Sequence, residues 1–230
     1  MQRFNDQAVV ITGGRNALST ELAQALRTEG ARVHEAETVT PQSADQLDHI
    51  DILITNNFFP LNAYPPTPTQ NLTPDVWREQ HAALFDPVYA ALHIAGRHML
   101  ARGVGCIVNI GPVQGLFAQS ERAAYSAAAA GMFMLTKALA VEWAAQGVRV
   151  NALACITETM DNPNSTELST SPDPALLSRL PIGRLPTNAE IIEAVLFLAS
   201  DEASFVTGEV LRVDGGWTAY HLFYPFESAF

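Results

Sequence analysis

The sequence has few cysteines and few basic residues, and each shortage argues against a class of protein. Only two cysteines occur in 230 residues. Cys106 and Cys155 each lie in an apolar stretch, so we expect buried free thiols, and no Cys/His cluster has the spacing of a metal site. There are 13 Lys and Arg against 24 Asp and Glu, for a net charge of −11. This balance disfavours nucleic acid and anionic membrane surfaces as partners.

Long apolar runs are also lacking. No uninterrupted stretch approaches the roughly 18 residues that a membrane span needs. Residues 1–6 are polar and lead directly into a predicted strand, which is unlike a signal peptide. We therefore expect a cytoplasmic protein. With 48% apolar residues, the 230 residues fit a single domain, 1–230, with one full core.

What the sequence does contain is a regular alternation of strand and helix patterns. Short apolar runs predict six strands, at residues 8–12, 31–34, 51–55, 106–110, 148–154 and 209–213. Helical spacing of apolar residues predicts helices at 18–26, 75–101 (interrupted near Asp86 and Pro87), 123–145 and 189–199. Such alternation is typical of an α/β fold with a single Rossmann-like, doubly wound parallel sheet covered on both faces.

One strand–helix unit is expected to be shortened. Residues 37–50 leave room for a single short helix, which we place at 43–49. The stretches 60–74 and 157–174 are rich in proline or in small polar residues, and are predicted to be loops. The turn Thr12-Gly13-Gly14 lies between the first strand and the first helix, which is how the β-α-β unit of a dinucleotide-binding fold begins.

Two long segments, residues 105–154 and 181–219, resemble the active-site and C-terminal segments of the short-chain dehydrogenase/reductase family. The glycine turn and the ITNN motif at residues 54–57 extend this resemblance over nearly the whole chain. The resemblance implies a nicotinamide dinucleotide at the carboxyl ends of the strands, and an active site made of an Asn, a Ser, a Tyr and a Lys.

The cofactor positions depart from the family pattern T-G-x-x-x-G-x-G. Ala17 and Ser19 replace its second and third glycines, Phe58 and Phe59 follow Asn56-Asn57, and Cys155-Ile156 replaces a Pro-Gly turn. Because side chains there would fill space that the cofactor uses, we expect no cofactor, or NAD bound weakly. The remnants of the site are Thr12, Gly13, Gly14, Glu37 (a candidate ribose partner) and Asn56.

The catalytic positions depart as well. Alignment places Ala83, Pro112 and Ala129 where the family has Asn, Ser and Lys, and retains only Tyr125. A free phenol has a pKa of about 10, and the family's lysine, one helical turn away, lowers it. Arg122 is a candidate to reach Tyr125, but its place near the start of the helix leaves this open.

These losses predict a non-catalytic subunit that supports or regulates an active paralogue within a homo- or hetero-oligomer. Such a chain would resemble the benzylsuccinate-pathway hydroxyacyl-CoA dehydrogenase, in which a degenerate subunit pairs with an active one. A second interpretation is altered chemistry, such as hydration, elimination or isomerisation, with Tyr125 in a pocket that also holds Asn57, Gln114 and Glu121. Two further functions are compatible with the cleft: a residual NAD(P)-dependent alcohol/ketone oxidoreductase and a small-molecule sensor.

Overall fold

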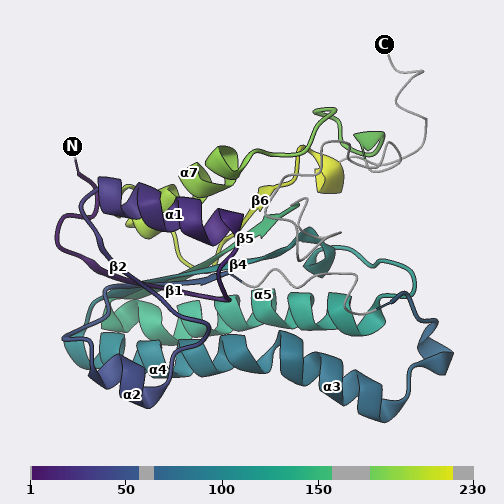
Figure 1. Ribbon diagram of the computed structural model, residues 1–230, viewed down its shortest axis with the longest axis horizontal. Helices are drawn as coiled ribbons and strands as arrows, with labels where there is room; N and C mark the ends of the chain where they lie inside the picture. Colours follow the sequence, from purple (N-terminus) through teal and green to yellow (C-terminus); the bar gives the residue numbers. More distant parts are fainter. Residues whose placement is uncertain (1, 57–64, 157–176, 220–230) are drawn as a thin grey trace.

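The sheet has six parallel strands, as the alternating pattern predicts (Figure 1). The structure is a computed structural model that describes residues 2–56, 65–156 and 177–219. The strand order is β2-β1-β3-β4-β5-β6, and every pair is parallel. The strands are β1 (Ala8–Thr12), β2 (Arg32–Glu35), β3 (Ile52–Asn56), β4 (Gly105–Pro112), β5 (Val148–Cys155) and β6 (Val210–Val213).

Helices cover both faces of the sheet (Figure 1). On one face, α1 (Ala17–Thr28) and α7 (Asn188–Ala199) pack on the strands through an aliphatic core that includes Leu22 and Val195. On the other face, α4 (Asp86–Arg102) and α5 (Ala123–Trp143) pack through a second core that includes Leu92 and Phe133. Burial on both faces explains why β1, β3 and β4 are apolar without alternation.

The predicted helix at 75–101 is two helices. The first is α3 (Pro74–Leu84), and α4 begins at Asp86 after the single residue Phe85. Pro87 lies in the first turn of α4, where a missing backbone N–H leaves no hydrogen bond unmade. The interruption predicted near Asp86 and Pro87 is therefore confirmed.

Between β2 and β3 the chain forms only α2 (Pro41–Asp45), so this unit is short, as expected. The helix lies earlier than the predicted 43–49. Thr40 is its N-cap, and the side chains of Thr40 and Ser43 each accept a hydrogen bond from the other residue's backbone N–H. Together with Pro41 at the first helical position, this capping box fixes the start of the helix.

The loops are described only in part. Residues 65–73 contain a 3-10 turn, Thr69–Asn71, while residues 57–64 and 157–176 lie outside the described residues. Further 3-10 turns are Val113–Gly115, Ala144–Gln146, Asp201–Ala203 and Trp217–Ala219.

Helix α5 with its following turn, Ala123–Gln146, is the one helix in the described part of the chain that is long and apolar enough to cross a membrane. Core helices satisfy the same criterion, and α5 contributes Met132, Phe133 and Ala140 to the core beneath β4 and β5. The length and composition of α5 are therefore weak evidence that it spans a membrane.

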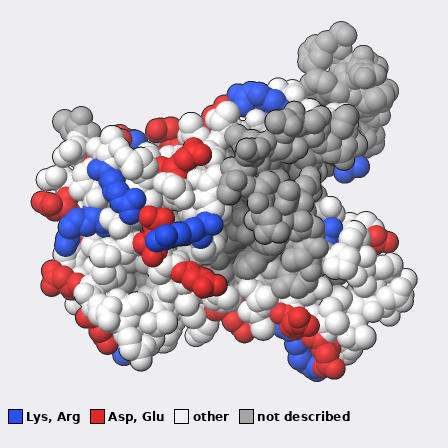
Figure 2. All heavy atoms as spheres, in the orientation of Figure 1, with Lys and Arg blue, Asp and Glu red and all other residues white. Residues whose placement is uncertain are grey.

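Charged side chains of both signs are interspersed on the face of the molecule shown in Figure 2. Ion pairs within the described residues include Arg27 with Glu35 at 2.9 Å and Arg3 with Glu29 at 2.6 Å. Some of the acidic side chains are thus paired with nearby basic ones.

Candidate active site

The glycine turn after β1 is built so closely that only glycine fits its first position. Gly13 has φ +100°, and a Cβ there would lie 1.9 Å from the backbone oxygen of Asn56 at the end of β3. The Gly13 N–H donates to the carbonyl oxygen of Glu37 at 3.2 Å. The turn therefore holds Glu37 and Asn56, both predicted cofactor remnants, on either side of Gly13.

Ser19, at the third glycine position, does not project into the cleft. It is 1% exposed, and its hydroxyl lies 3.0 Å from the carbonyl oxygens of Gly14 and Asn16. The same hydroxyl accepts a hydrogen bond from the Asn16 N–H at 2.9 Å, and the Asn16 side chain accepts from the Ser19 N–H. Ser19 thus completes the N-terminal cap of α1, and only Ala17 adds a half-buried methyl group to the turn.

We expect Ser19→Gly to destabilise the protein by about 1–2 kcal/mol, although it restores the family's residue. The change removes a reciprocal cap and adds a flexible residue to the first helical turn. Urea unfolding followed by circular dichroism measures the effect. Thr20→Ala, at the next and exposed position of α1, is the control and should stay within about 0.5 kcal/mol. Equal stabilities for the two variants would contradict the capping role.

The turn also presents unused hydrogen-bonding groups. The N–H groups of Ala17 and Leu18 open helix α1 and have no hydrogen-bond partner within the described part of the chain, as is usual for a first helical turn. Asn56 is 1% exposed; its Nδ2 donates to Asn16 Oδ1 at 3.2 Å, while its buried Oδ1 has no partner among the described residues. Two donors and one acceptor therefore remain for a ligand beside Gly13.

A chain of buried polar side chains joins β3, β4 and α5. The Thr55 hydroxyl donates to Asn109 Oδ1 at 2.8 Å, and Asn109 Nδ2 donates to the Thr136 hydroxyl at 2.9 Å. All three residues are fully buried. This chain ties α5, which carries Tyr125, to the centre of the sheet, and the sequence pattern did not predict it.

Tyr125, the retained family residue, lies in the first turn of α5 and is 3% exposed. It packs in a small apolar cluster with Leu84, Val113, Ala128, Ile156, Leu180 and Leu185. Its buried hydroxyl has no hydrogen-bond partner in the described residues. Burial raises the pKa of Tyr125 above the ordinary value for a phenol, and the positive charge of Arg122 partly opposes this.

The other catalytic positions provide no polar group. Pro112 is the last residue of β4 and is buried, and Ala129 is 7% exposed one helical turn after Tyr125. In α3 it is Leu84, not the neighbouring Ala83, that packs in the Tyr125 cluster; Ala83 is only half-buried. Ala83 and Leu84 both lie just before the helix break at Phe85. Phe58 and Phe59 lie outside the described residues.

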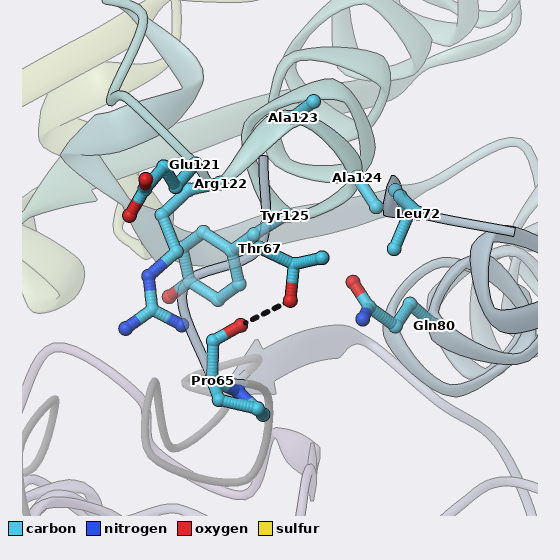
Figure 3. A pocket seen from close by; sticks show the side chains of 9 residues that line it. All are labelled: Pro65, Thr67, Leu72, Gln80, Glu121, Arg122, Ala123, Ala124 and Tyr125. Carbon is cyan, nitrogen blue, oxygen red and sulfur yellow. Dashed lines mark hydrogen bonds between the residues drawn. The ribbon is translucent and has the colours of Figure 1, made fainter. Parts of the chain in front are cut away.

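A small hollow lies beside Tyr125 (Figure 3). The loop before α3, helix α3 and the start of α5 enclose it. Two hydrogen bonds of Thr67 fix the loop that lines it. The Thr67 N–H donates to the Glu121 carbonyl oxygen at 2.9 Å, and the Thr67 hydroxyl donates to the Pro65 carbonyl oxygen at 3.0 Å. The lining residues are Pro65, Thr67, Leu72, Gln80, Glu121, Arg122, Ala123, Ala124 and Tyr125.

The hollow gathers some of the predicted pocket residues and adds others. Glu121 and Tyr125 are brought together as expected, whereas Gln114 is not in the lining and Asn57 lies outside the described residues. Thr67 and Gln80 were missed because nothing in their sequence context distinguishes them from surface residues. Within the described residues, no group of three or more His, Cys, Asp or Glu side chains is placed to hold a metal ion.

Comparison with known proteins shows the family. Residues 17–218 match the family described as enoyl-(acyl carrier protein) reductase. The chain is 36% identical over 222 residues to cis-4-hydroxycyclohexanecarboxylate dehydrogenase of Sinomonas cyclohexanicum, covering 92% of this chain and 87% of that protein. The chain therefore belongs to the short-chain dehydrogenase/reductase family.

A solved structure and a second relative add detail. The gluconate 5-dehydrogenase of Burkholderia cenocepacia, solved in complex with NADP and tartrate, is 28% identical with a TM-score of 0.78, covering 96% of this chain and 99% of that one. A protein of Xanthobacter autotrophicus named inactive 2-(S)-hydroxypropyl-CoM dehydrogenase 2 is 39% identical over 149 residues, covering 63% of this chain and 65% of that protein.

These relatives correct the expected function. Relatives that align with about nine tenths of the chain are named as dehydrogenases, so the prediction of a non-catalytic supporting subunit is wrong. The narrower resemblance to the benzylsuccinate-pathway subunit is not what these relatives show. The expectation of no cofactor, or of weakly bound NAD, agrees only in part with the family, since a solved neighbour holds NADP.

Proposed function

We propose that the protein is an NAD(H)-dependent oxidoreductase that interconverts a ketone and an alcohol, with Tyr125 as the proton donor and acceptor. The observation that carries this proposal is the hydroxyl of Tyr125, buried beside a hollow with no partner among the described residues. A buried polar group without a partner costs about 1–3 kcal/mol. A substrate oxygen in the hollow would supply the missing partner, whereas a tyrosine kept only for packing would gain from losing its hydroxyl.

The residues beside Gly13 fit the phosphates and ribose of a dinucleotide. The N–H groups of Ala17 and Leu18, which have no partner among the described residues, lie at the positive end of α1, which favours a pyrophosphate. The orphaned Oδ1 of Asn56 can accept a hydrogen bond from a ribose hydroxyl. The methyl group of Ala17 keeps a phosphate farther from the backbone than glycine would, so we expect weak binding, with a dissociation constant of about 0.1–1 mM.

A bound nicotinamide supplies or accepts the hydride; the chain itself handles the proton. Because burial keeps Tyr125 protonated near neutral pH, it is ready to donate to a carbonyl oxygen, which favours the reduction direction. Pro112 offers no second donor to that oxygen. One lost donor of this kind lowers turnover by about 10²–10³-fold, so we expect a slow enzyme.

The proposal is tested by adding NADH and then a panel of cyclic and open-chain ketones to the purified protein. Energy transfer from the protein's three tryptophans to NADH reports binding, and loss of NADH absorbance reports turnover. We expect saturable binding and slow reduction of at least one ketone. No binding up to several millimolar NADH, together with no turnover, would overturn the proposal.

We expect NADH to bind at least about tenfold more tightly than NADPH, because of Glu37. The Glu37 backbone carbonyl accepts from the Gly13 N–H, so its exposed carboxylate is near enough to accept hydrogen bonds from the ribose hydroxyls of NADH and to repel the extra phosphate of NADPH. Glu37→Gln should reduce this preference to less than about threefold. Glu21→Gln removes an acid from the exposed side of α1, where it accepts a hydrogen bond from Asn188, and should leave the preference unchanged. An unchanged preference in Glu37→Gln would place the selectivity elsewhere.

Self-association is a separate proposal. The outer surfaces of α4 and α5 expose large apolar side chains, with Tyr89 52%, Met134 63% and Val141 84% exposed. The two helices lie together on one side of the sheet (Figure 1), so these side chains are suited to contact a second copy of the chain. Sedimentation velocity at micromolar concentration measures whether such a dimer forms.

A further inference from the structure

Tyr125 lacks the lysine that lies one helical turn after the catalytic tyrosine in the family. Ala129 carries no charge, and Lys137 is twelve residues further along α5, which is about 18 Å of helical rise. Burial disfavours the phenolate further, since a phenolate in an apolar cluster is poorly solvated. If Tyr125 transfers a proton, a different cation must stabilise it.

Arg122 is placed to do so. It is the N-cap residue of α5, three positions before Tyr125, and residues at this spacing lie on the same side of a helix. Both side chains line the same hollow, and Figure 3 shows them extending in the same direction along it. The charge of Arg122 lowers the pKa of Tyr125, against the effect of burial.

The backbone holds Arg122 in this position. The preceding residue, Glu121, has φ +60°, a conformation that side chains other than glycine seldom adopt. Its carbonyl oxygen accepts the Thr67 N–H at 2.9 Å, which joins the loop before α3 to the start of α5. The strained turn thus directs Arg122 toward the hollow. The positive end of the α5 dipole, like the charge of Arg122, favours the phenolate form of Tyr125.

We propose that Arg122 replaces the family's lysine as the positive charge that stabilises Tyr125 when it gives up its proton. This inference rests on the proposed function. A reduced nicotinamide held beside Gly13 and Asn56 would supply a hydride to the substrate carbonyl carbon during reduction, and the electron pair of the C=O π bond would move to oxygen. That oxygen takes the Tyr125 proton, which leaves the phenolate beside Arg122. A proton from solvent then restores the phenol. Arg122 is a positioning residue, since it acts through Tyr125.

Among the described residues, the titratable groups around Tyr125 come from the start of α5 and the end of β5. Arg122 and Glu121 lie at the start of α5, and the Cys155 thiol lies at the end of β5. Burial raises the pKa of Cys155, so it stays neutral at ordinary pH. From α3, the hollow is lined by the neutral side chain of Gln80. Arg122 is therefore the group whose removal should change the ionisation of Tyr125 most.

The experiment replaces Tyr125 with a fluorinated tyrosine, whose phenol ionises at lower pH than tyrosine itself, and follows its ionisation by fluorine NMR. In that background we expect Arg122→Gln to make the phenol about tenfold harder to ionise, in line with loss of a nearby opposite charge. Arg122→Lys should change the ionisation constant less than about threefold. Lys137→Gln removes a positive charge from the same helix, far from Tyr125, and should have no effect.

Each outcome has a clear meaning. If Arg122→Gln leaves the ionisation constant unchanged, or shifts it no more than Lys137→Gln does, the proposal is overturned. Should Arg122→Gln fail to fold, Arg122→Met removes the same charge from a side chain of similar length, and the same outcomes apply. In the unlabelled protein, Arg122→Gln should lower kcat at least about tenfold with little change in KM. An altered ionisation in a protein that shows no turnover would support the Arg122 role while rejecting the proposed function.

Discussion

Tyr125→Phe is expected to lower ketone reduction by at least about 10³-fold and to leave the protein as stable as before, or slightly more stable. A positioned proton donor contributes about 10²–10⁴-fold to such a reaction, and no other side-chain donor is available at Pro112 or Ala129. The hydroxyl is buried without a partner among the described residues, so its removal relieves a desolvation cost while the ring continues to fill the apolar cluster. Steady-state kinetics and thermal unfolding measure the two effects.

The control for this variant is Tyr89→Phe. Tyr89 lies on α4 and is 52% exposed, so loss of its hydroxyl should alter neither turnover nor stability. NADH binding by Tyr125→Phe should stay within about twofold of the unmodified protein, because the groups proposed to bind the cofactor lie in the turn after β1, at the start of α1 and at the end of β3. Turnover above about a tenth of normal in Tyr125→Phe would exclude Tyr125 as the proton donor.

The pH dependence should differ between the two reaction directions. Because burial raises the pKa of Tyr125, the phenol stays protonated from about pH 6 to 9, and reduction should be nearly constant there. Alcohol oxidation needs the phenolate, so its rate should rise with pH throughout this range. Initial rates in both directions across this range measure the difference.

Local patterns predict much of the fold. The six strands are predicted because most of them are buried on both faces and are therefore apolar throughout, and the helix break is marked by Pro87. The start of α2 lies two residues before the predicted one because Thr40 is its N-cap. Capping depends on a side chain turning back to the backbone, and apolar spacing does not record it.

The site was less predictable because its chemistry depends on contacts between distant segments. Ser19 was expected to obstruct the cofactor turn, but its hydroxyl is used within the cap of α1. The polar chain of Thr55, Asn109 and Thr136 joins residues far apart in sequence. Comparing positions with a family pattern identifies which side chains are lost. It does not decide whether a nearby group such as Arg122 takes over a lost role; the sequence named Arg122 as a candidate and left this open, because its position depends on the turn before α5.

Gly13→Ala is expected to destabilise the protein by more than about 3 kcal/mol, lowering its melting temperature by about 6–12 °C. Two effects combine at this position. A φ of +100° strains any side chain by about 1–3 kcal/mol, and the new Cβ would lie 1.9 Å from the Asn56 backbone oxygen. That oxygen ends β3, which pairs with β1 on one side and β4 on the other, so the backbone cannot move without disturbing the centre of the sheet. Urea unfolding measures the loss.

Gly14→Ala separates the two effects, because the next glycine has a similar conformation without the contact. Gly14 has φ +84°, and a Cβ there would meet no atom within 4 Å. Its substitution should therefore cost only the backbone strain, about 1 kcal/mol, and should weaken NADH binding less than Gly13→Ala does. If the two variants lose the same stability, the close approach of Gly13 to Asn56 does not govern this turn. A Gly13→Ala protein that unfolds at the normal urea concentration would contradict the geometry of the turn altogether.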